Sequence, residues 1–312
     1  MTLSRRDLLR LGLGAGAFLA VGGGAGRASG GGLREIQEAD LIHHTIPSSG
    51  ERIPAIGIGM RNYRTEWIEE EGRYRRTIEA FHEMGGRVLD TAPSYGDSES
   101  HLGRILEELG VREDMFIATK VDRRGREAGV ERMEASLDRI GTGYVDLMQV
   151  HNLRGWETQL ETLRDWKEEG RVRYLGITTS SDRQYDQMAR IMEREELDFI
   201  QVDYSLGDRS AADRILPMAR EREIATLINL PFGRGELFEA VEGEPLPDWA
   251  GEIDADTWAQ VFLKYVISHP AVTVAIPGTT EPGHARDNVG AMMGRLPDPP
   301  MRRKIEETYD AL

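Results

Sequence analysis

The sequence contains no cysteine. This absence excludes disulfide bonds, zinc–thiolate sites and a thiol nucleophile. Basic residues are in the minority, because 39 Lys and Arg face 54 Asp and Glu and the formal net charge is −15. Binding to nucleic-acid phosphates needs a basic surface, and the sequence has no basic stripe, so we expect no nucleic-acid partner.

Metal-ligand spacing and long apolar runs are also missing. His43, His44 and His82 have no ligand partners at metal spacing, so no metal site is predicted. The most apolar stretch, 11–24, is short and rich in glycine, whereas a membrane span needs about 20 predominantly apolar residues. The sequence therefore predicts no stable membrane insertion of the mature chain.

The first 30 residues have the pattern of an export signal. The pair Arg5-Arg6 precedes the apolar stretch, and small residues follow between Ala25 and Ala28. This order is typical of a twin-arginine signal peptide, which the twin-arginine translocase recognises on folded proteins. We expect cleavage near Ala28 and a periplasmic or extracellular mature protein; a retained anchor helix is the alternative.

Residues 31–312 alternate between short apolar runs and helical patterns, which predicts one (β/α)8 barrel domain. A doubly wound open sheet is the rival fold, but no G-x-G-x-x-G follows the first strand. A hairpin is expected through residues 48–50, and residues 233–251 are predicted to form a loop over the barrel mouth. The predicted strands are Ile53–Gly59, Val88–Asp90, Phe116–Lys120, Tyr144–His151, Val172–Thr178, Phe199–Tyr204, Ile224–Leu230 and Val272–Ile276. The predicted helices cover residues 74–84, 99–109, 130–140, 156–169, 182–194, 211–222 and 256–269.

Three successive strands end in residues that carry chemistry. Asp90, Lys120 and His151 each close an apolar run, and Tyr95 lies in the turn after the first of these strands. Because the carboxyl ends of barrel strands meet at one face, we expect the four side chains to lie together. Each alone is more often a capping, packing or surface residue, so their coincidence is the evidence for a site.

Together these residues can form a proton donor. A free phenol has a pKa near 10 and is a poor acid at neutral pH, but a neighbouring ammonium stabilises the phenolate. Asp90 would keep Lys120 charged beside Tyr95, and His151 can orient a substrate carbonyl. Such general acid catalysis contributes roughly 10²–10⁴-fold. None of the four is a reductant, so carbonyl reduction would need a hydride from a bound cofactor.

The segment from Leu89 to Gly103, LDTAPSYGDSESHLG, resembles the signature of the aldo-keto reductases. The resemblance spans roughly residues 45–295 and includes GITT at 176–179, QVDYS at 201–205 and IPGTTEPGHARDN at 276–288. It implies a (β/α)8 barrel that reduces aldehydes or ketones with NADPH. It also implies that Tyr95 is the general acid, that Lys120 and Asp90 tune it, and that His151 orients the carbonyl.

The resemblance also implies a cofactor site along the barrel mouth. Thr178, Thr179 and Gln201 would lie near the nicotinamide carboxamide, and Asn288 near the adenine. The full set of implied cofactor residues is Gly59, Met60, Thr178, Thr179, Gln201, Leu230, Gly278, Thr279, Thr280, His284 and Asn288.

Several positions depart from the family pattern. Thr178 and Thr179 stand where the family commonly has Ser-Asn, so Thr179 lacks the amide. Gly278 and His284 stand where many members have two permanent cations for the 2′-phosphate, so NADP is preferred on family grounds and NAD stays an alternative. Thr280 and Arg286 can still contact a phosphate. Asn229 stands where an aromatic ring often stacks on the nicotinamide, a contact that Phe232 can replace.

Two functions remain open from the sequence. The first is an exported carbonyl reductase, which the complete set of four residues favours. The second is a non-catalytic cofactor-binding module that senses redox state or docks a partner, which the altered phosphate site favours. Substrate contacts are expected in the loops at 60–67, 152–156 and 232–249, with Phe238 and Trp249 as candidates.

Overall fold

The computed structural model describes residues 41–64 and 68–312. The predicted signal segment at residues 1–30 lies outside this range. Within the described residues, no helix has the length and apolar character needed to cross a bilayer.

Eight parallel strands form the centre of the fold, in the order β10-β9-β8-β7-β6-β5-β4-β3. A bridge between Ile56 and Ala275 joins the two edges, and the Gly59 N–H donates to the Pro277 carbonyl at 3.0 Å, so the sheet closes into a barrel. The predicted (β/α)8 architecture is confirmed. The strands are β3 (Gly57–Gly59), β4 (Val88–Asp90), β5 (Phe116–Val121), β6 (Val145–His151), β7 (Val172–Thr178), β8 (Phe199–Asp203), β9 (Ala225–Asn229) and β10 (Val274–Ala275).

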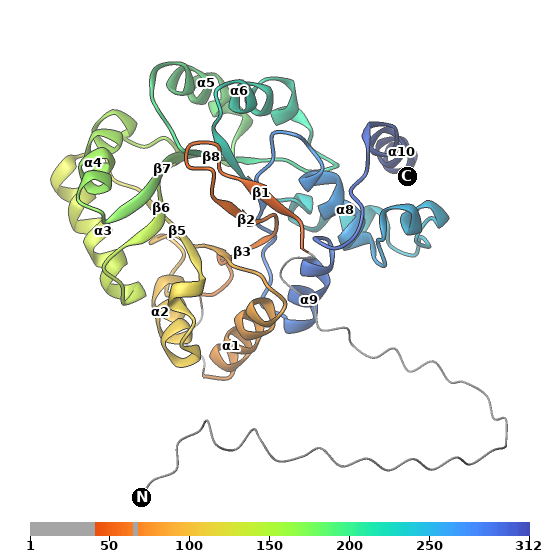
Figure 1. Ribbon diagram of the computed structural model, residues 1–312, viewed down its shortest axis with the longest axis horizontal. Coiled ribbons are helices and arrows are strands. Elements are labelled where there is room, and N and C mark those ends of the chain that lie inside the picture. The colour runs from red at the N-terminus through yellow and green to blue at the C-terminus, as the bar shows by residue number, and fades with distance from the viewer. Residues whose placement is uncertain (1–40, 65–67) are drawn as a thin grey trace, which may run out of the picture. The chain divides into compact units, whose positions relative to one another are not determined.

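Helices surround the barrel, as Figure 1 shows. Each long helix alternates with a strand along the chain, and α2 and α3 end at Gly110 and Gly141, which adopt the left-handed conformation that caps helices. The helices are α1 (Ile68–Glu83), α2 (Ser98–Leu109), α3 (Arg126–Ile140), α4 (Trp156–Glu168), α5 (Tyr185–Arg194), α6 (Ile215–Glu221), α7 (Glu236–Ala240), α8 (Trp258–Ile267), α9 (Pro282–Gly290) and α10 (Pro299–Asp310).

The interior of the barrel is apolar at the end where the strands begin and polar where they end. Alternate residues of a strand point to the same side, so each strand contributes one inward column. Phe116, Leu147 and Phe199 belong to the apolar interior cluster, and Lys120, Gln149 and Gln201 lie further along the same columns. The columns therefore carry their polar side chains to the carboxyl end of the barrel.

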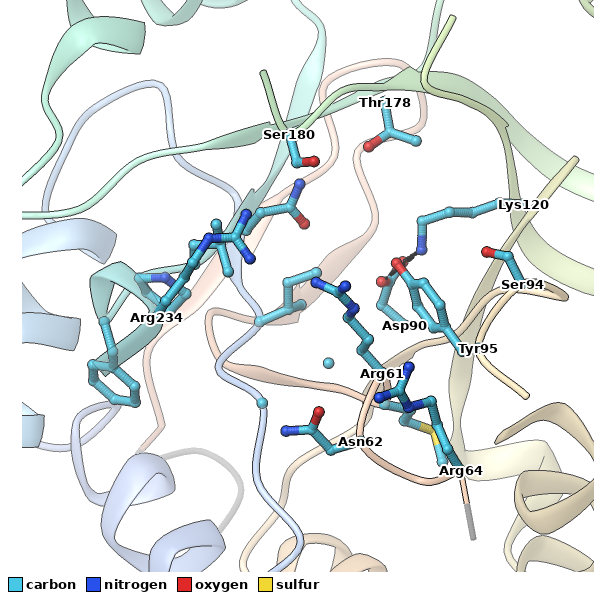
Figure 2. Close-up of a pocket in the computed structure, with 18 of the residues that line it drawn as sticks. Arg61, Asn62, Arg64, Asp90, Ser94, Tyr95, Lys120, Thr178, Ser180 and Arg234 are labelled. Carbon is cyan, nitrogen blue, oxygen red and sulfur yellow. Dashed lines mark hydrogen bonds and ion pairs between the residues drawn. The ribbon is translucent and has the colours of Figure 1, made fainter. Parts of the chain in front are cut away.

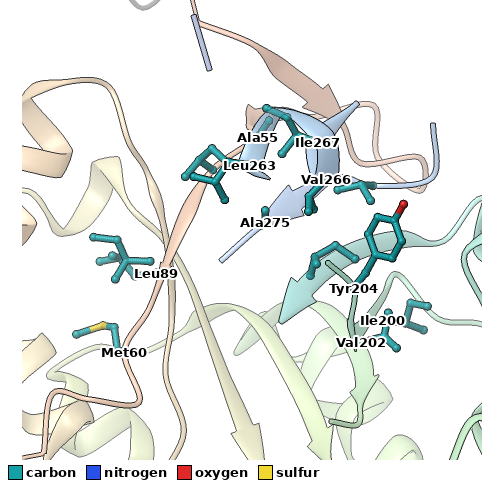
Figure 3. Close-up of a cluster of buried hydrophobic side chains, with 14 of the residues drawn as sticks. Ala55, Met60, Leu89, Ile200, Val202, Tyr204, Leu263, Val266, Ile267 and Ala275 are labelled. Carbon is teal, nitrogen blue, oxygen red and sulfur yellow. The ribbon is translucent and has the colours of Figure 1, made fainter. Parts of the chain in front are cut away.

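A hairpin made of β1 (His43–Thr45) and β2 (Arg52–Pro54) covers the amino-terminal end of the barrel. Its Ile46 and Ile53 belong to the interior cluster, and Figure 1 shows the hairpin across the centre of the ring. The predicted hairpin is confirmed. A second apolar layer lies between the barrel and its helices, and Figure 3 shows part of it, including Leu89, Ile200 and Val266.

The elements match the predicted pattern with three corrections. The predicted first strand, 53–59, is divided between two partners, because β2 pairs with the hairpin and β3 pairs with β4. The predicted last strand shortens to β10, which has two residues. The predicted loop at 233–251 contains α7 and two 3₁₀ helices, Gly233–Gly235 and Asp248–Ile253.

Candidate active site

A cavity of about 670 Å³ opens at the carboxyl ends of the strands. All four candidate catalytic residues, Asp90, Tyr95, Lys120 and His151, line it. Figure 2 shows three of them, Asp90, Tyr95 and Lys120. The structure thus brings together the residues that the sequence places at the ends of three strands and in one turn.

Lys120 and Asp90 form a buried ion pair at the bottom of this cavity. Lys120 Nζ donates to both Asp90 carboxylate oxygens, at 2.8 and 2.7 Å, and to the Thr91 carbonyl at 2.7 Å. Burial favours the neutral amine, but the Asp90 carboxylate outweighs burial, so the pKa of Lys120 is raised above its ordinary value. Lys120 is therefore a permanent cation at neutral pH.

Two buried amides complete the environment of Asp90. Gln201 Nε2 donates to Asp90 Oδ2 at 3.1 Å, and Gln149 Nε2 lies 3.4 Å from Asp90 Oδ1. Gln201 also donates to Asn229 Oδ1 at 2.7 Å, which extends the network to the end of β9. These donors satisfy the carboxylate and fix its orientation toward Lys120.

Tyr95 is held in the turn between β4 and α2. Its N–H donates to the Ala92 carbonyl at 3.0 Å, and Arg132 donates to the Pro93 carbonyl at 3.0 Å. The centroid of the Tyr95 ring lies 5.1 Å from Lys120 Nζ. At this separation the positive charge of the ammonium can stabilise the phenolate form of Tyr95. The turn therefore places the hydroxyl of Tyr95 in the cavity beside a positive charge.

His151, the last residue of β6, meets Tyr95 edge to face. The ring centroids are 6.0 Å apart and the planes make an angle of 86°. Burial and then the nearby charge of Lys120 lower the pKa of His151 to about 3, with a further contribution from Arg61. The imidazole is therefore neutral at physiological pH and can donate one hydrogen bond to a bound oxygen.

Asp203 is a second carboxylate near the network, at the end of β8. Burial raises its pKa to about 6, against the opposing effects of Asn229 and of the charge on Arg234. Its Oδ1 is buried and has no hydrogen-bond partner within the described residues.

The residues that resemblance assigns to the cofactor fall into two groups. Five of them line the cavity, and the other six do not. The lining group is Gly59, Met60, Thr178, Leu230 and Gly278. The second group is Thr179, Gln201, Thr279, Thr280, His284 and Asn288.

Several of the second group have partners inside the protein. Thr179 is fully buried, and its hydroxyl donates to Gln184 Oε1 at 2.6 Å. The Thr279 hydroxyl accepts from the Glu281 N–H at 3.1 Å, and the Thr280 carbonyl accepts from Thr77 at 2.8 Å.

The nicotinamide end of a dinucleotide fits the donors present. A carboxamide needs both donors and acceptors, and Thr178 and Asn229 line the cavity with such groups. Gln201 Oε1 adds a buried acceptor that has no partner among the residues the structure describes. Because this oxygen is enclosed and Gln201 does not line the cavity, Thr178 and Asn229 are the residues that can reach a carboxamide directly.

The phosphate end is less positive than the family pattern implies. His284 is exposed, and Arg286 pairs with Glu83 at 3.3 Å. Glu281 in turn pairs with Arg73 at 2.7 Å. The residues present therefore fit a nicotinamide dinucleotide, with no permanent cation at the two positions where the family pattern has them.

Three arginines in the cavity wall were missed by the sequence reasoning. Arg61 and Arg64 follow β3, and Arg234 follows β9. The loops that carry them were predicted to contact substrate, but position alone does not separate these arginines from other exposed cations. Of the two predicted aromatic contacts, Phe238 lines the cavity, whereas Trp249 packs against the core and faces Lys304 at 5.9 Å.

Comparison with known proteins agrees with this geometry. Residues 55–307 match the model of the aldo/keto reductase family. Aldo-keto reductase YhdN of Bacillus subtilis is 32% identical over 214 residues, which cover 63% of this chain and 64% of that protein. The NADH-specific methylglyoxal reductase of Escherichia coli is 26% identical over 279 residues, which cover 71% of this chain and 83% of that protein.

Solved structures show the same fold. An aldo/keto reductase from Klebsiella pneumoniae, in complex with NADP and acetate, is 25% identical, with a TM-score of 0.71 over 83% of this chain and 93% of that one. A holo aldo-keto reductase from Bacillus halodurans is 24% identical, with a TM-score of 0.72 over 86% and 96%.

The family match covers most of the chain and includes every strand of the barrel. The oxidoreductase class predicted from the sequence is thereby confirmed. This chain belongs to the aldo/keto reductase family.

Proposed function

We propose that this protein reduces aldehyde or ketone carbonyls to alcohols with NADPH, using Tyr95 as the proton donor. The observation that carries the proposal is the convergence of Tyr95, His151, Lys120 and Asp90 on one cavity. The four side chains come from separate segments, and their contacts are those that a proton donor and an oxygen-binding site require.

The proton is transferred from the Tyr95 hydroxyl to the carbonyl oxygen of the substrate. Lys120 stays charged because of Asp90, and its ammonium stabilises the phenolate that remains. His151 is neutral and donates a hydrogen bond to the same oxygen, which orients the carbonyl. Since the Lys120–Asp90 pair is preorganised and buried, its charge requires little reorganisation during the reaction.

The cofactor supplies the hydride when bound. Thr178 and Asn229 would hold its nicotinamide end, with Gln201 behind them bonded to Asn229, and Gly278 would lie beside its phosphates. NADP is supported by the Klebsiella relative, whose structure contains it, and NAD by the NADH-specific relative from Escherichia coli. Dissociation constants for NADPH and NADH separate the two, and equal affinity would defeat the NADP preference.

The test of the reaction is a single-turnover measurement. Enzyme-bound NADPH is mixed with reactive aldehydes and diketones, and its oxidation is compared between wild type and Tyr95→Phe. We expect a carbonyl-dependent oxidation that slows by about 10²–10⁴-fold in the variant while NADPH binding is kept. Binding without oxidation by any carbonyl would instead favour the cofactor-sensing module.

We further propose export by the twin-arginine route, on the basis of Arg5-Arg6 and the apolar stretch that follows. The mature protein would then act in the periplasm or outside the cell. Cell fractionation of wild type and of a variant with both arginines replaced by lysine tests this proposal. If the two proteins are distributed equally between the fractions, export by this route is contradicted. If the exported protein keeps its intact N-terminus, cleavage is contradicted.

A further inference from the structure

The charges that line the cavity do not balance. Asp90 is the only acid among its lining residues in the described part of the chain, and Lys120 neutralises it. Arg61, Arg64 and Arg234 line the same cavity, and none of them has an ion pair within the described residues. In a chain with a net charge of −15, this is a local excess of positive charge.

The three arginines occupy two parts of the wall. In the view of Figure 2, Arg61 and Arg64 lie on the side of Asp90 and Tyr95, and Arg234 lies on the other side, near Ser180. The charge of Arg234 acts on Asp203, at the end of β8, and the charge of Arg61 acts on His151. Arg61 and His151 line the same cavity.

Arg61 and Arg64 stand on a fixed turn. The Met60 N–H donates to the Asp90 carbonyl at 2.8 Å, and the Met60 carbonyl accepts from Ser98 at 3.0 Å and from the Tyr63 N–H at 3.0 Å. Tyr63, which with Asn62 separates the two arginines in the sequence, is fully buried. The backbone that carries both cations is thus bonded to the same strand end that carries Asp90.

The backbone of Arg64 also lies close to the Tyr95 turn. A Cβ added at Gly96 would meet Arg64 Cβ at 3.4 Å and the Arg64 carbonyl oxygen at 3.5 Å. Gly96 has a φ of +62° and follows Tyr95, so the two turns pack backbone to backbone. The backbone of Arg64 therefore stands beside the turn that carries Tyr95, and both residues line the same cavity.

Resting on the carbonyl reduction proposed above, we propose that the substrate is an aldehyde or ketone that carries an anionic oxygen group, either carboxylate or phosphate, and that Arg61 and Arg64 bind that group. Guanidinium forks match both kinds of oxyanion. An anion at this position compensates the excess positive charge while the carbonyl lies between Tyr95 and His151.

Matched substrates test the charge. The carboxylate arm compares 4-oxobutanoate with its methyl ester, and the phosphate arm compares glyceraldehyde 3-phosphate with glyceraldehyde. We expect a higher kcat/KM for the anionic member of at least one pair, and the arm with the larger preference identifies the anion. Loss of one charged hydrogen bond predicts a fall of about 10- to 100-fold in that preference for Arg61→Gln or Arg64→Gln. Equal kcat/KM within both pairs for the wild type would overturn the proposal.

Two controls separate the proposal from other roles. Arg190→Gln removes the same charge from an exposed position on α5, outside the cavity, and should leave the preference unchanged. The dissociation constant of NADPH should be equal in wild type, Arg61→Gln and Arg64→Gln. Weaker NADPH binding in these two variants would assign the arginines to the cofactor and overturn the proposal.

Binding of a non-reducible anion separates this proposal from the proposed function. Succinate and inorganic phosphate are titrated into the NADP-saturated protein by calorimetry. We expect Tyr95→Phe, which keeps both arginines, to bind one of these anions as wild type does. The double variant Arg61→Gln, Arg64→Gln should lose that binding. If no carbonyl is reduced but this binding is present, the proposed function fails and the anion site stands. If neither anion binds the wild type, the anion site fails.

Discussion

Asp90 is the residue on which the charge of the site depends. Its two oxygens accept from Lys120, Gln149 and Gln201, and the residue is 2% exposed. Removing one partner of a buried ion pair is more costly than removing both, since it leaves an uncompensated charge.

Asp90→Asn should therefore lower the free energy of unfolding by about 3–5 kcal/mol. Without the carboxylate, burial lowers the pKa of Lys120, and the kcat pH profile should gain an inflection where Lys120 loses its proton. Asp146→Asn is the matched control, because Asp146 is also buried and pairs with Arg173 at 2.6 Å, at the opposite end of the barrel. The control should lose stability but keep the pH profile of wild type. Identical pH profiles for all three proteins would contradict the role of Asp90.

The neutral state of His151 is a second prediction at this scale. Its pKa of about 3 means that the ring does not titrate between pH 5 and 8. Nitrogen NMR of labelled histidine would follow the seven histidines of the chain, with His151→Gln used for assignment. A midpoint near 6.5 for His151 would show instead that the ring is protonated during part of the physiological range.

The residues of the site were predictable to different degrees. Asp90, Lys120 and His151 close apolar runs, so strand periodicity points to them directly. Gln149 lies two residues before His151 on the same face of β6, a position that the alternation could have indicated. Arg61 could not be told apart from other exposed arginines in the sequence. What distinguishes it is that it forms no ion pair with a described carboxylate in the folded protein, and the sequence does not show this.

At the scale of elements, the close approach of α2 to the end of α3 leaves room only for glycine at one position. Gly103 lies on α2, and a Cβ there would be 2.5 Å from the Arg139 carbonyl oxygen and 2.7 Å from that of Ile140, at the end of α3. Neither backbone atom can move without displacing its helix.

Gly103→Ala should therefore destabilise the protein by about 1–3 kcal/mol, as overpacking does. Gly283→Ala is the control, since Gly283 lies in the first turn of α9 with open space around its Cβ position. The control should be neutral or slightly stabilising, because alanine has the higher helix propensity. Urea unfolding of both variants measures the difference, and equal midpoints would show that α2 and α3 separate at little cost.

The error in predicting the first strand also comes from contacts between distant segments. The apolar run at 53–59 is continuous in sequence, but the chain changes partner within it: Pro54 pairs with His43 of the hairpin, and Gly57 pairs with Val88 of the barrel. Strand periodicity does not show which strand a segment pairs with. The barrel itself was predictable because eight alternations of strand and helix in one chain leave few other folds.

At the scale of the molecule, stability should depend on pH through partly buried histidines. Burial, and then Arg302 and Arg220, lower the pKa of His269 to about 4. Its Nδ1 accepts the Ala271 N–H at 3.2 Å, a bond that protonation destroys. The pKa of His151 is lowered in the same way. Asp203, whose pKa is raised to about 6, has the opposite effect on the pH dependence of stability.

The sign follows from proton binding. Between about pH 4 and the ordinary value of 6.5, the unfolded chain protonates His269 and the folded chain does not. The stabilisation is therefore complete above 6.5 and is lost as the pH falls through this window, at no more than about 1.4 kcal/mol per pH unit and less where solvent reaches the ring. Asp203 acts in the reverse sense: its contribution is present below 3.8 and is lost as the pH rises through about 6.

His269→Asn isolates one of these groups, because the asparagine oxygen can accept the same N–H without titrating. Urea unfolding at pH 5, 6 and 7 should show that the variant loses less stability on acidification than wild type does. Its m-value should be unchanged, since the surface exposed on unfolding is the same. Parallel dependences on pH for the two proteins would mean that His269 titrates alike in the folded and unfolded states. The acid sensitivity would then have to come from other groups, among them His44 and His151, whose pKa values burial also lowers.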